Sequence, residues 1–585
     1  MMRNPGDIEL GQVAGTNQPL ILPKTGRQTH LYVCGSTNSG KSKFLECLVR
    51  QDIADWSRTK TGLMVLDPHG SLYDNLMDWL AWHPALADRP IIPIDLRQRD
   101  WIIPYNVLRP RAGASASVVV DNVVRAMAHV WGQAGTDQTP LFARIAADFL
   151  HPLYERGYTL VEAFQLLDDP AFRRVITEQL KDRLARRDWQ VANRLSAKDF
   201  EAQISSTVNR LHRFLSNEHM CAILGQSQQT LDLRQVLDDG AILLVCTSRE
   251  GGAVSDEDAN LFATLLLNDL WEAARLRGKP KDARDIRSFH VYVDEFQRFV
   301  TPTLAENLNE ARGYGIHLTM AHQYPSQLTE NGTNGKRLYN SIMANANSKV
   351  VFRTQIPGDL PDLAQWLFMG VMNPDEIKHE LYSTKVMGYR EEYRKAYSRS
   401  RSHSQGGGEH HSLVEGGGGG QSIQYFDENG MAVSGMAESS NEYLADTAGE
   451  STSWSEVESE SESKVPILLP VFGQELSHVQ FRSLEEQLFR AMATLFAQDQ
   501  RQCVARLTGM KAPVSLMTPF VSNPPTPQAR LQRYREKLFE RLPYALRMAD
   551  AVSLIEERRQ KLLASPLELS GSDEPVSAKR SLPKS

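Results

Sequence analysis

The chain has 585 residues, of which 41% are hydrophobic, and a formal net charge of −6. This length allows more than one domain, and the hydrophobic share allows a sizeable core. The negative charge excludes a wholly basic nucleic-acid binder, so any nucleic-acid surface must be local. Five scattered cysteines without a CxxC pair favour reduced thiols over a disulfide framework. With no signal peptide and no apolar run of 18 residues, we expect a cytoplasmic protein that reaches a membrane only through partners.

The first two thirds of the chain predict an α/β core with a helical insertion. Residues 1–30 predict a short hairpin that leads into the core. HLYVC, a Gly-rich turn, a helix and GLMVLD then follow one another, which is typical of a parallel sheet. Residues 115–235 have helical periodicity and almost no strand signal. The sheet resumes with AILLVCT, FHVYVDEF, IHLTMAH and KVVFRT, so the core is expected over 31–114 and 236–370.

The last third of the chain changes in composition. We expect a helical extension over 371–403, followed by a disordered linker over 404–464. This linker is rich in Gly, Ser and acidic residues and too polar to bury a core. A C-terminal accessory segment is expected over 465–565, with charged helices from residue 527, and a disordered tail over 566–585.

A glycine-rich turn carries the clearest chemical signal. It fits the pattern GxxxxGK[ST] in full, and its residues are Gly35, Ser36, Thr37, Asn38, Ser39, Gly40, Lys41 and Ser42. In such a loop, backbone N–H groups point at phosphate oxygens and the next helix adds its positive end. Lys41 would reach the β- and γ-phosphates of ATP, and the Ser42 hydroxyl would coordinate Mg2+. The alternative is an ordinary turn with a solvated lysine.

A pair of carboxylates follows a later strand. In FHVYVDEFQRF, Asp294 and Glu295 come directly after an apolar run, which is the Walker B arrangement. Asp294 would hold the Mg2+ water shell, and Glu295 would polarise the attacking water. A solvated turn is the alternative for this pair alone, but a phosphate loop in the same α/β pattern favours the functional interpretation.

Four further stretches resemble the HerA/FtsK superfamily of ring-forming motors, and most of all the coupling-protein ATPases of type IV secretion and conjugation. These stretches are LDPHGSLYDNL, TVNRLHRFLSNEHMCAILGQSQQTLDLRQVLDDGAILLV, EARGYGIHLTMAHQYPSQL and ANSKVVFRT. The similarity covers about residues 28–365. It implies a RecA-like P-loop core that hydrolyses ATP with Mg2+, an inserted all-α domain, and a homo-oligomeric ring, expected to be a hexamer.

The resemblance also implies roles for single residues. Gln323 would sense the γ-phosphate, and Arg312 would act as an arginine finger on the ATP of a neighbouring subunit. Arg353 is a second candidate for that contact. Asp67 and His69 are expected beside the nucleotide without an assigned role. The alternatives are an ordinary surface ion pair for Arg312, a polar strand end for Gln323 and a structural role for Arg353.

The implied cargo is DNA, double-stranded in the first instance and single-stranded as the alternative. Residues 173–213 hold ten Lys or Arg against five Asp or Glu, which would suit a phosphate backbone or simply be a solvated helix face. Residues 385–403, which mix Arg, Lys and Tyr, could contact single strands or lead into the linker. His410 and His411 lack further ligands at metal-binding spacing.

We therefore expect an ATP-driven DNA translocase of the conjugative coupling type in the bacterial cytoplasm. A relaxase, a secretion channel or a nuclease would be its partner, and direct membrane insertion is not expected. Two alternatives stay open. One is a protein-secreting or defence-associated motor that powers a partner, and the other is an ATP-binding switch or scaffold with little turnover.

Overall fold

The computed structural model describes most of the chain. The described residues are 3–111, 113–132, 139–278, 286–299, 308, 310–329, 332–404, 424–426, 432–434, 455–522 and 525–564. The chain divides into two compact units, Met1–Pro374 with Ser483–Ser585, and Asp375–Arg482. No helix in the described ranges is long and apolar enough to cross a lipid bilayer.

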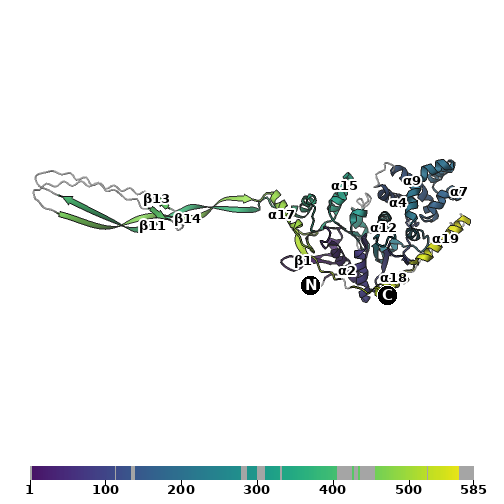
Figure 1. The fold of residues 1–585 in the computed structure, drawn as a ribbon, viewed down its shortest axis with the longest axis horizontal. Coiled ribbons are helices and arrows are strands. Elements are labelled where there is room, and N and C mark those ends of the chain that lie inside the picture. Colours follow the sequence, from purple (N-terminus) through teal and green to yellow (C-terminus); the bar gives the residue numbers. More distant parts are fainter. Residues whose placement is uncertain are drawn as a thin grey trace. The chain divides into compact units, whose positions relative to one another are not determined.

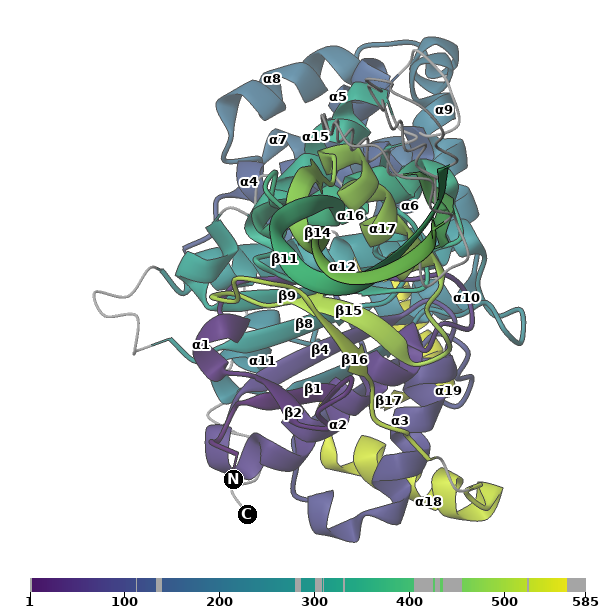
Figure 2. The ribbon, with the colours of Figure 1, turned by 90° about the vertical axis from the view of Figure 1, so that its left-hand side faces the viewer.

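An eleven-stranded sheet forms the centre of the first unit, and Figure 2 labels several of its strands. The strand order is β2-β1-β16-β15-β10-β3-β9-β8-β4-β7-β5. The strands from β10 to β5 in this order run parallel, and the other four join by antiparallel pairs. The parallel strands are β3 (Leu31–Cys34), β4 (Gly62–Asp67), β5 (Ile91–Asp95), β7 (Ile242–Cys246), β8 (Phe289–Val293), β9 (Ile316–His322) and β10 (Ser348–Phe352). The antiparallel strands are β1 (Ile8–Val13), β2 (Pro19–Leu22), β15 (Gln502–Arg506) and β16 (Val514–Met517). The predicted α/β class with a parallel-rich sheet is thus confirmed.

Helices cover both faces of this sheet, because the central strands are apolar on both sides. Leu31 and Val33 of β3 pack in the same core as α2 and α3, whereas Tyr32 and Cys34 join the core of α12 and the helical insertion. This alternation follows from the two-residue period of a strand. The helices of the core are α1 (Lys24–Arg27), α2 (Lys41–Thr59), α3 (Ser71–Trp82), α12 (Asp256–Leu276), α14 (Ser326–Thr329), α15 (Gly332–Asn345) and α16 (Leu360–Phe368).

The insertion between β6 (Trp101–Ile102) and β7 contains only helices within its described residues, and Figure 1 shows them gathered at one end of the first unit. They are α4 (Ala116–Gly132), α5 (Thr139–Arg156), α6 (Glu162–Asp168), α7 (Pro170–Glu178), α8 (Arg183–Ala192), α9 (Ala197–Leu215), α10 (Glu218–Leu224) and α11 (Leu233–Asp239). Asp169 and Asp182 cap α7 and α8, which explains these short helices. Arg173 from the basic stretch is buried and donates to the carbonyl of Leu167, so this cation is structural.

The C-terminal residues belong to the core rather than to a separate accessory segment. Helix α17 (Leu484–Phe496) starts at a capping box formed by Ser483 and Glu486 and packs on α16. Strand β15 then pairs with β10, and β16 pairs with β1. Beyond them, α18 (Gln528–Arg541) packs on α3 and β5, β17 (Leu546–Arg547) pairs with β6, and α19 (Met548–Ala564) packs on α10. Pairing between strands so distant in sequence leaves no local signal, which is why the expected boundary at 465 fails.

The second unit is an antiparallel hairpin where a helical extension and a linker were expected. Its long strands are β11 (Ile377–Ser404) and β14 (Ser455–Phe481), and the short pair is β12 (Gln424–Phe426) with β13 (Ala432–Ser434). Residues 377–403 are therefore strand, because the residues of β11 find partners 51 to 104 positions away along the chain. Residues 455–464 of the expected linker belong to β14. His410, His411 and the tail 566–585 lie outside the described residues.

Candidate phosphate-binding site

The loop of residues 35–40 connects β3 to α2 at the carboxyl ends of the parallel strands, here called the carboxyl edge. The Gly35 N–H donates to the carbonyl of His322, and the Ser36 N–H to that of Arg353, so the ends of β9 and β10 hold the loop. A Cβ on Gly35 would lie 2.5 Å from the Cβ of Phe352, closer than real contacts allow. Gly40 has φ 105°, a left-handed backbone that favours glycine. Both glycines of the motif are therefore required by the backbone geometry.

The mouth of this loop suits an anion. Helix α2 begins at Lys41, and no side chain caps its N-terminus. Its first N–H groups have no intrahelical acceptor and carry the positive end of the helix dipole. The hydroxyl of Ser39 is buried and has no hydrogen-bond partner. Such unsatisfied donors fit the oxygens of a phosphate group.

The acidic pair faces the phosphate loop, as predicted. Lys41 Nζ lies 3.1 Å from Glu295 Oε1 and 3.4 Å from Asp294 Oδ1. The Ser42 hydroxyl donates to Asp294 Oδ2 at 2.9 Å. Burial lowers the pKa of Lys41, but the charges of Asp294 and Glu295 outweigh it and raise that pKa, so the ammonium stays protonated. Lys41, Ser42 and the two carboxylates thus form one charged cluster at the carboxyl edge.

Glu295 is held in a strained and fully ionised state. Its φ is 48°, in the left-handed region, which costs a non-glycine residue about 1 kcal/mol or more. The polar side chains around its carboxylate are Lys41 (3.1 Å), Gln323 (3.1 Å), His69 (3.8 Å) and Gln297. Burial acts to raise the pKa of Glu295, but hydrogen bonds from its neighbours and the charge of Lys41 hold it well below the ordinary value. A permanently ionised carboxylate in this place can orient and polarise a water molecule.

Gln323 bridges the loop and the acidic pair. Its amide nitrogen donates to Glu295 Oε1, and its amide oxygen accepts from the Thr37 hydroxyl at 3.4 Å. Because Gln323 directly follows β9, it connects the phosphate loop to Glu295 through one side chain. This placement suits the predicted γ-phosphate sensor, and the role itself remains a prediction.

Asp67 and His69, which the sequence left without an assigned role, have different surroundings in the structure. The buried carboxylate of Asp67 accepts from the N–H groups of His69 and Tyr73, both at 2.9 Å, and so holds the turn from β4 into α3. Burial raises the pKa of Asp67 above its ordinary value. His69 Nε2 instead lies 3.8 Å from Glu295 Oε1, and the nearby carboxylate raises the pKa of the imidazole. Asp67 is therefore structural, and His69 belongs to the site.

The two candidate arginines lie at opposite ends of the strands. Arg312 is exposed in a 3-10 turn (Arg312–Tyr314) before β9, whereas Gln323 follows the same strand. Seven strand residues separate them, about 23 Å. Arg312 is thus too far to reach the phosphate loop of its own chain. Arg353 lies beside that loop, since its carbonyl accepts from the Ser36 N–H and hydroxyl, and its buried Nε has no hydrogen-bond partner.

Two contacts of the site were not predicted. Gln297 donates to Glu295 Oε2 from two residues along the chain, which the motif DEFQ did not reveal. The N–H of Arg501 donates to the carbonyl of Ser39 at 2.9 Å, which brings the C-terminal segment onto the phosphate loop. No local pattern around Arg501 signals this contact, because the sheet brings it there.

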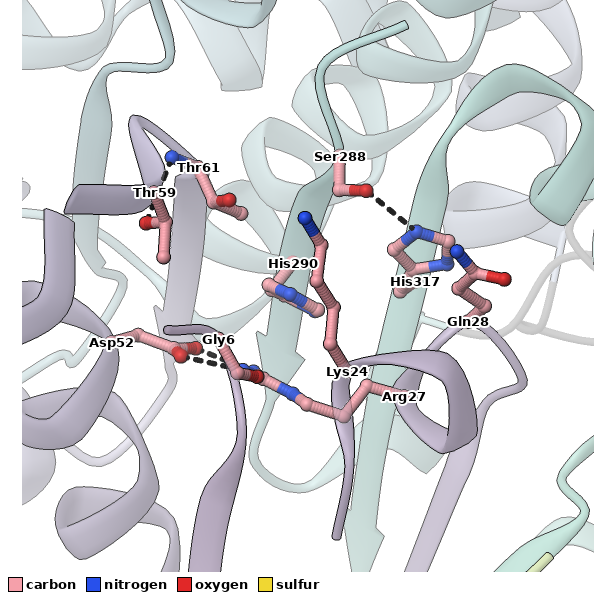
Figure 3. A pocket seen from close by; sticks show the side chains of 10 residues that line it. All are labelled: Gly6, Lys24, Arg27, Gln28, Asp52, Thr59, Thr61, Ser288, His290 and His317. Carbon is pink, nitrogen blue, oxygen red and sulfur yellow. Dashed lines mark hydrogen bonds and ion pairs between the residues drawn. The ribbon is translucent and has the colours of Figure 1, made fainter. Parts of the chain in front are cut away.

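A polar pocket lies away from the phosphate loop, at the amino ends of β8 and β9, here called the amino edge (Figure 3). Arg27 donates to both carboxylate oxygens of Asp52, at 2.7 and 2.6 Å, and to the hydroxyl of Tyr292 at 2.9 Å. His290 and His317 project from β8 and β9 beside this pair. Burial lowers the pKa of His317 to about 3 and that of His290 well below its ordinary value, so both rings are neutral. Within the described residues, no group of three or more His, Cys, Asp or Glu could hold a metal ion.

Comparisons with known proteins support a relationship over part of the chain. A family model described as the TraM recognition site of TraD and TraG matches residues 288–369, which include the acidic pair, Arg312, Gln323 and Arg353. No curated protein sequence matches the chain.

Solved structures that resemble the chain include two of a plasmid coupling protein. The bacterial conjugative coupling protein TrwBdeltaN70, unbound, is 13% identical, covers 88% of this chain and 90% of its own, and gives a TM-score of 0.45. TrwB in complex with ADP and Mg2+ is 13% identical, the match covers 88% of this chain and 91% of the TrwB chain, and the TM-score is 0.43. VirB4 of Thermoanaerobacter pseudethanolicus is 14% identical, the match covers 64% of this chain and 90% of the VirB4 chain, and the TM-score is 0.42. Through its phosphate loop, its acidic pair and the family match over residues 288–369, the chain is similar to the P-loop motors of the conjugative coupling-protein type.

Proposed function

We propose that the chain is an ATPase of the conjugative coupling-protein kind that couples hydrolysis to DNA translocation. One observation carries the nucleotide part of this proposal: Lys41 lies 3.1 Å from Glu295 and 3.4 Å from Asp294. A phosphate loop that faces an acidic pair on the same sheet is the arrangement used to bind and cleave a nucleoside triphosphate. The TrwB structures in complex with ADP and Mg2+ and with an ATP analogue support ATP and Mg2+ as the ligands.

The residues of the chain divide the chemistry among them. Backbone N–H groups of the loop and Lys41 would bind and orient the phosphates, while Glu295 would orient and polarise the attacking water. Ser42 and Asp294 are the side chains that would hold Mg2+, which when bound neutralises phosphate charge. Gln323 would connect the state of the terminal phosphate to the end of β9.

The position of Arg312 supports a ring. Because it lies about 23 Å from its own loop, it can neutralise phosphate charge only in the site of another subunit. A ring of identical subunits, with a hexamer as our specific proposal, would place each amino edge against a neighbour's carboxyl edge. Arg353 was the second candidate for this trans contact, but it lies beside its own loop, so we propose it for contact with the phosphates of its own subunit.

DNA is the proposed cargo, and a relaxase, a secretion channel or a nuclease is the proposed partner, in the bacterial cytoplasm. The family match supports the coupling-protein assignment. In the insertion, Arg174, Arg183 and Arg187 are exposed and available to phosphates. By contrast, Arg173 is buried against the ring of Phe200, so the basic surface is smaller than the sequence count suggests. Residues 385–395 belong to the hairpin and are a second candidate for contact with single strands.

The decisive test measures ATP turnover with no DNA, with duplex DNA and with single-stranded DNA, together with oligomer size by light scattering. We expect DNA to stimulate turnover and to promote rings, with an effect that weakens steeply as salt rises. Turnover that ignores both DNAs would favour the protein-moving or defence-associated motor. If the parent protein hydrolyses ATP at a negligible rate, and Glu295→Gln does not change that rate, an ATP-binding switch or scaffold would be favoured.

A further inference from the structure

The C-terminal segment forms one wall of the phosphate loop. Besides its hydrogen bond to Ser39, the backbone of Arg501 lies directly against Gly40. A Cβ on Gly40 would lie 3.3 Å from Arg501 N and 3.4 Å from its Cα. Arg501 itself has φ 70°, so the chain bends sharply as it passes the loop and enters β15. This wall comes from residues that the phosphate-loop motif does not include.

Arg501 is also tied to the end of β16 by reciprocal hydrogen bonds. Its Nε and Nη2 donate to the carbonyl of Thr518 at 3.1 and 2.7 Å. In return, the N–H and hydroxyl of Thr518 donate to the carbonyl of Arg501 at 2.9 and 3.1 Å. Thr518 is buried, so this connection is rigid. It fixes where the chain goes after β16.

The next residues carry an aromatic ring to the surface beside the loop. Phe520 is 75% exposed, and the Arg501 guanidinium carbon lies 5.5 Å from its ring centroid. Single exposed apolar residues are common, so exposure alone indicates nothing. Its place gives it significance, because the ring lies on the guanidinium of Arg501, whose backbone lies against Gly40.

The sheet order says which part of a nucleotide faces this wall. Strands β9 and β8 lie on one side of β3, and β10 and β15 lie on the other. Lys41, Asp294 and Glu295 gather on the β8 side, so the terminal phosphate and Mg2+ belong there. The ribose and base of a nucleotide held by the loop must then leave on the β10 and β15 side. Arg501, Thr518 and Phe520 lie on that side.

We propose that this wall is the base subsite of the nucleotide, with the ring of Phe520 as the surface on which a purine stacks. The inference rests on the proposed nucleotide binding and adds the residues that hold the base. Arg501 is a positioning residue, because its guanidinium already donates to Thr518. Stacking is tolerant of base identity, since every base has a π-face. The subsite therefore does not select strongly between adenine and guanine.

Three variants at surface positions test this subsite in the full-length chain. Phe520→Leu keeps an apolar side chain but removes the ring, and Phe520→Trp keeps a ring. Phe489→Leu is the control, because Phe489 is 67% exposed on α17. Calorimetry would measure the affinity of each variant for ATP with Mg2+ and for inorganic tripolyphosphate, which has no base. A fluorescent triphosphate of 2-aminopurine riboside would report stacking by quenching.

Phe520→Leu should weaken ATP binding by about 10-fold, a typical loss for one base–aromatic contact, and leave tripolyphosphate binding unchanged. Phe520→Trp should restore ATP affinity, Phe489→Leu should change nothing, and only the variants with a ring at 520 should quench 2-aminopurine. Unchanged ATP affinity in Phe520→Leu would overturn the subsite, as would an equal loss for ATP and tripolyphosphate. A parent protein that binds neither ligand would instead refute the proposed nucleotide site, so the two failures are distinguishable.

Discussion

The two edges of the parallel strands are built in opposite ways. At the carboxyl edge, Glu295 adopts a strained backbone, the Ser39 hydroxyl has no partner, and no side chain caps α2. At the amino edge, Arg27 and Asp52 satisfy each other with two hydrogen bonds and share Tyr292. Strain and unsatisfied donors mark a surface prepared for a ligand, whereas a buried ion pair with satisfied hydrogen bonds stabilises the fold. The difference predicts that substitutions at the first edge change activity and those at the second change stability.

Lys41→Ala should give the largest effect and tests the functional edge directly. Removing the ammonium takes away the charge that orients and neutralises the phosphates, so turnover should fall by about 1000-fold or more. Phosphate release under saturating ATP is the measurement. Lys43→Ala, two residues along the same helix with a 44% exposed side chain, is the matched control and should retain turnover. Normal turnover in Lys41→Ala would end the assignment of this edge.

Arg312→Ala tests whether the amino edge of one subunit meets the carboxyl edge of its neighbour. We expect turnover to fall by about 100-fold to 1000-fold, while ATP affinity and unfolding stability stay within error, because Arg312 is exposed. Mixing Arg312→Ala with Glu295→Gln should recover part of the turnover, since some interfaces then combine an intact Glu295 with an intact Arg312. Absence of recovery on mixing would contradict action in trans.

Arg27→Met tests the stabilising edge. Methionine fills similar space but leaves the buried Asp52 carboxylate without its cation, which should lower the free energy of unfolding by about 3–5 kcal/mol. Denaturant unfolding followed by circular dichroism measures this change. Arg58→Met is the control, because the Arg58 side chain is 52% exposed in its pair with Asp55. If the folded fraction of Arg27→Met loses ATP affinity instead of stability, the contrast between the edges is incorrect.

Lys349→Met should give the smallest effect and an increase in stability. Lys349, near the amino end of β10, is buried with its ammonium donating to the carbonyl of Ala346 at 2.6 Å. Burial, with the nearby charge of Arg506, lowers the pKa of Lys349 to about 8 from an ordinary value of 10.5. Between pH 8 and about 10.5, the unfolded chain binds this proton more tightly than the folded chain does. The charged Lys349 therefore destabilises the folded state fully below pH 8, and this destabilisation disappears above about pH 10.5.

Thermal unfolding at two pH values checks this expectation. Lys349→Met should be more stable than the parent by about 1 kcal/mol at pH 7, with little difference at pH 10. An equal gain at both pH values would mean that packing against Trp366, which lies 5.4 Å from the ammonium, is responsible rather than charge.

The hairpin unit shows where inference from sequence fails. A helical extension was expected over 371–403. In the structure, β11 pairs with β14 in a register that sets Lys395 beside Glu462. Strand pairing depends on a partner, and here the partner lies beyond a long glycine-rich stretch. Only the three-dimensional structure brings the two strands together.

The sequence by itself determined the phosphate loop, the acidic pair and the α/β order of the core. Each of these is written in consecutive residues: the glycines of 35–40, the helix that follows, and Asp294 and Glu295 after an apolar run. The tertiary structure decided what touches them. It placed Arg501 on the loop, His69 and Gln297 on Glu295, and Arg312 at the edge away from its own loop. Motifs record local chemistry, whereas contacts across a sheet depend on strand order, which no short stretch of sequence contains.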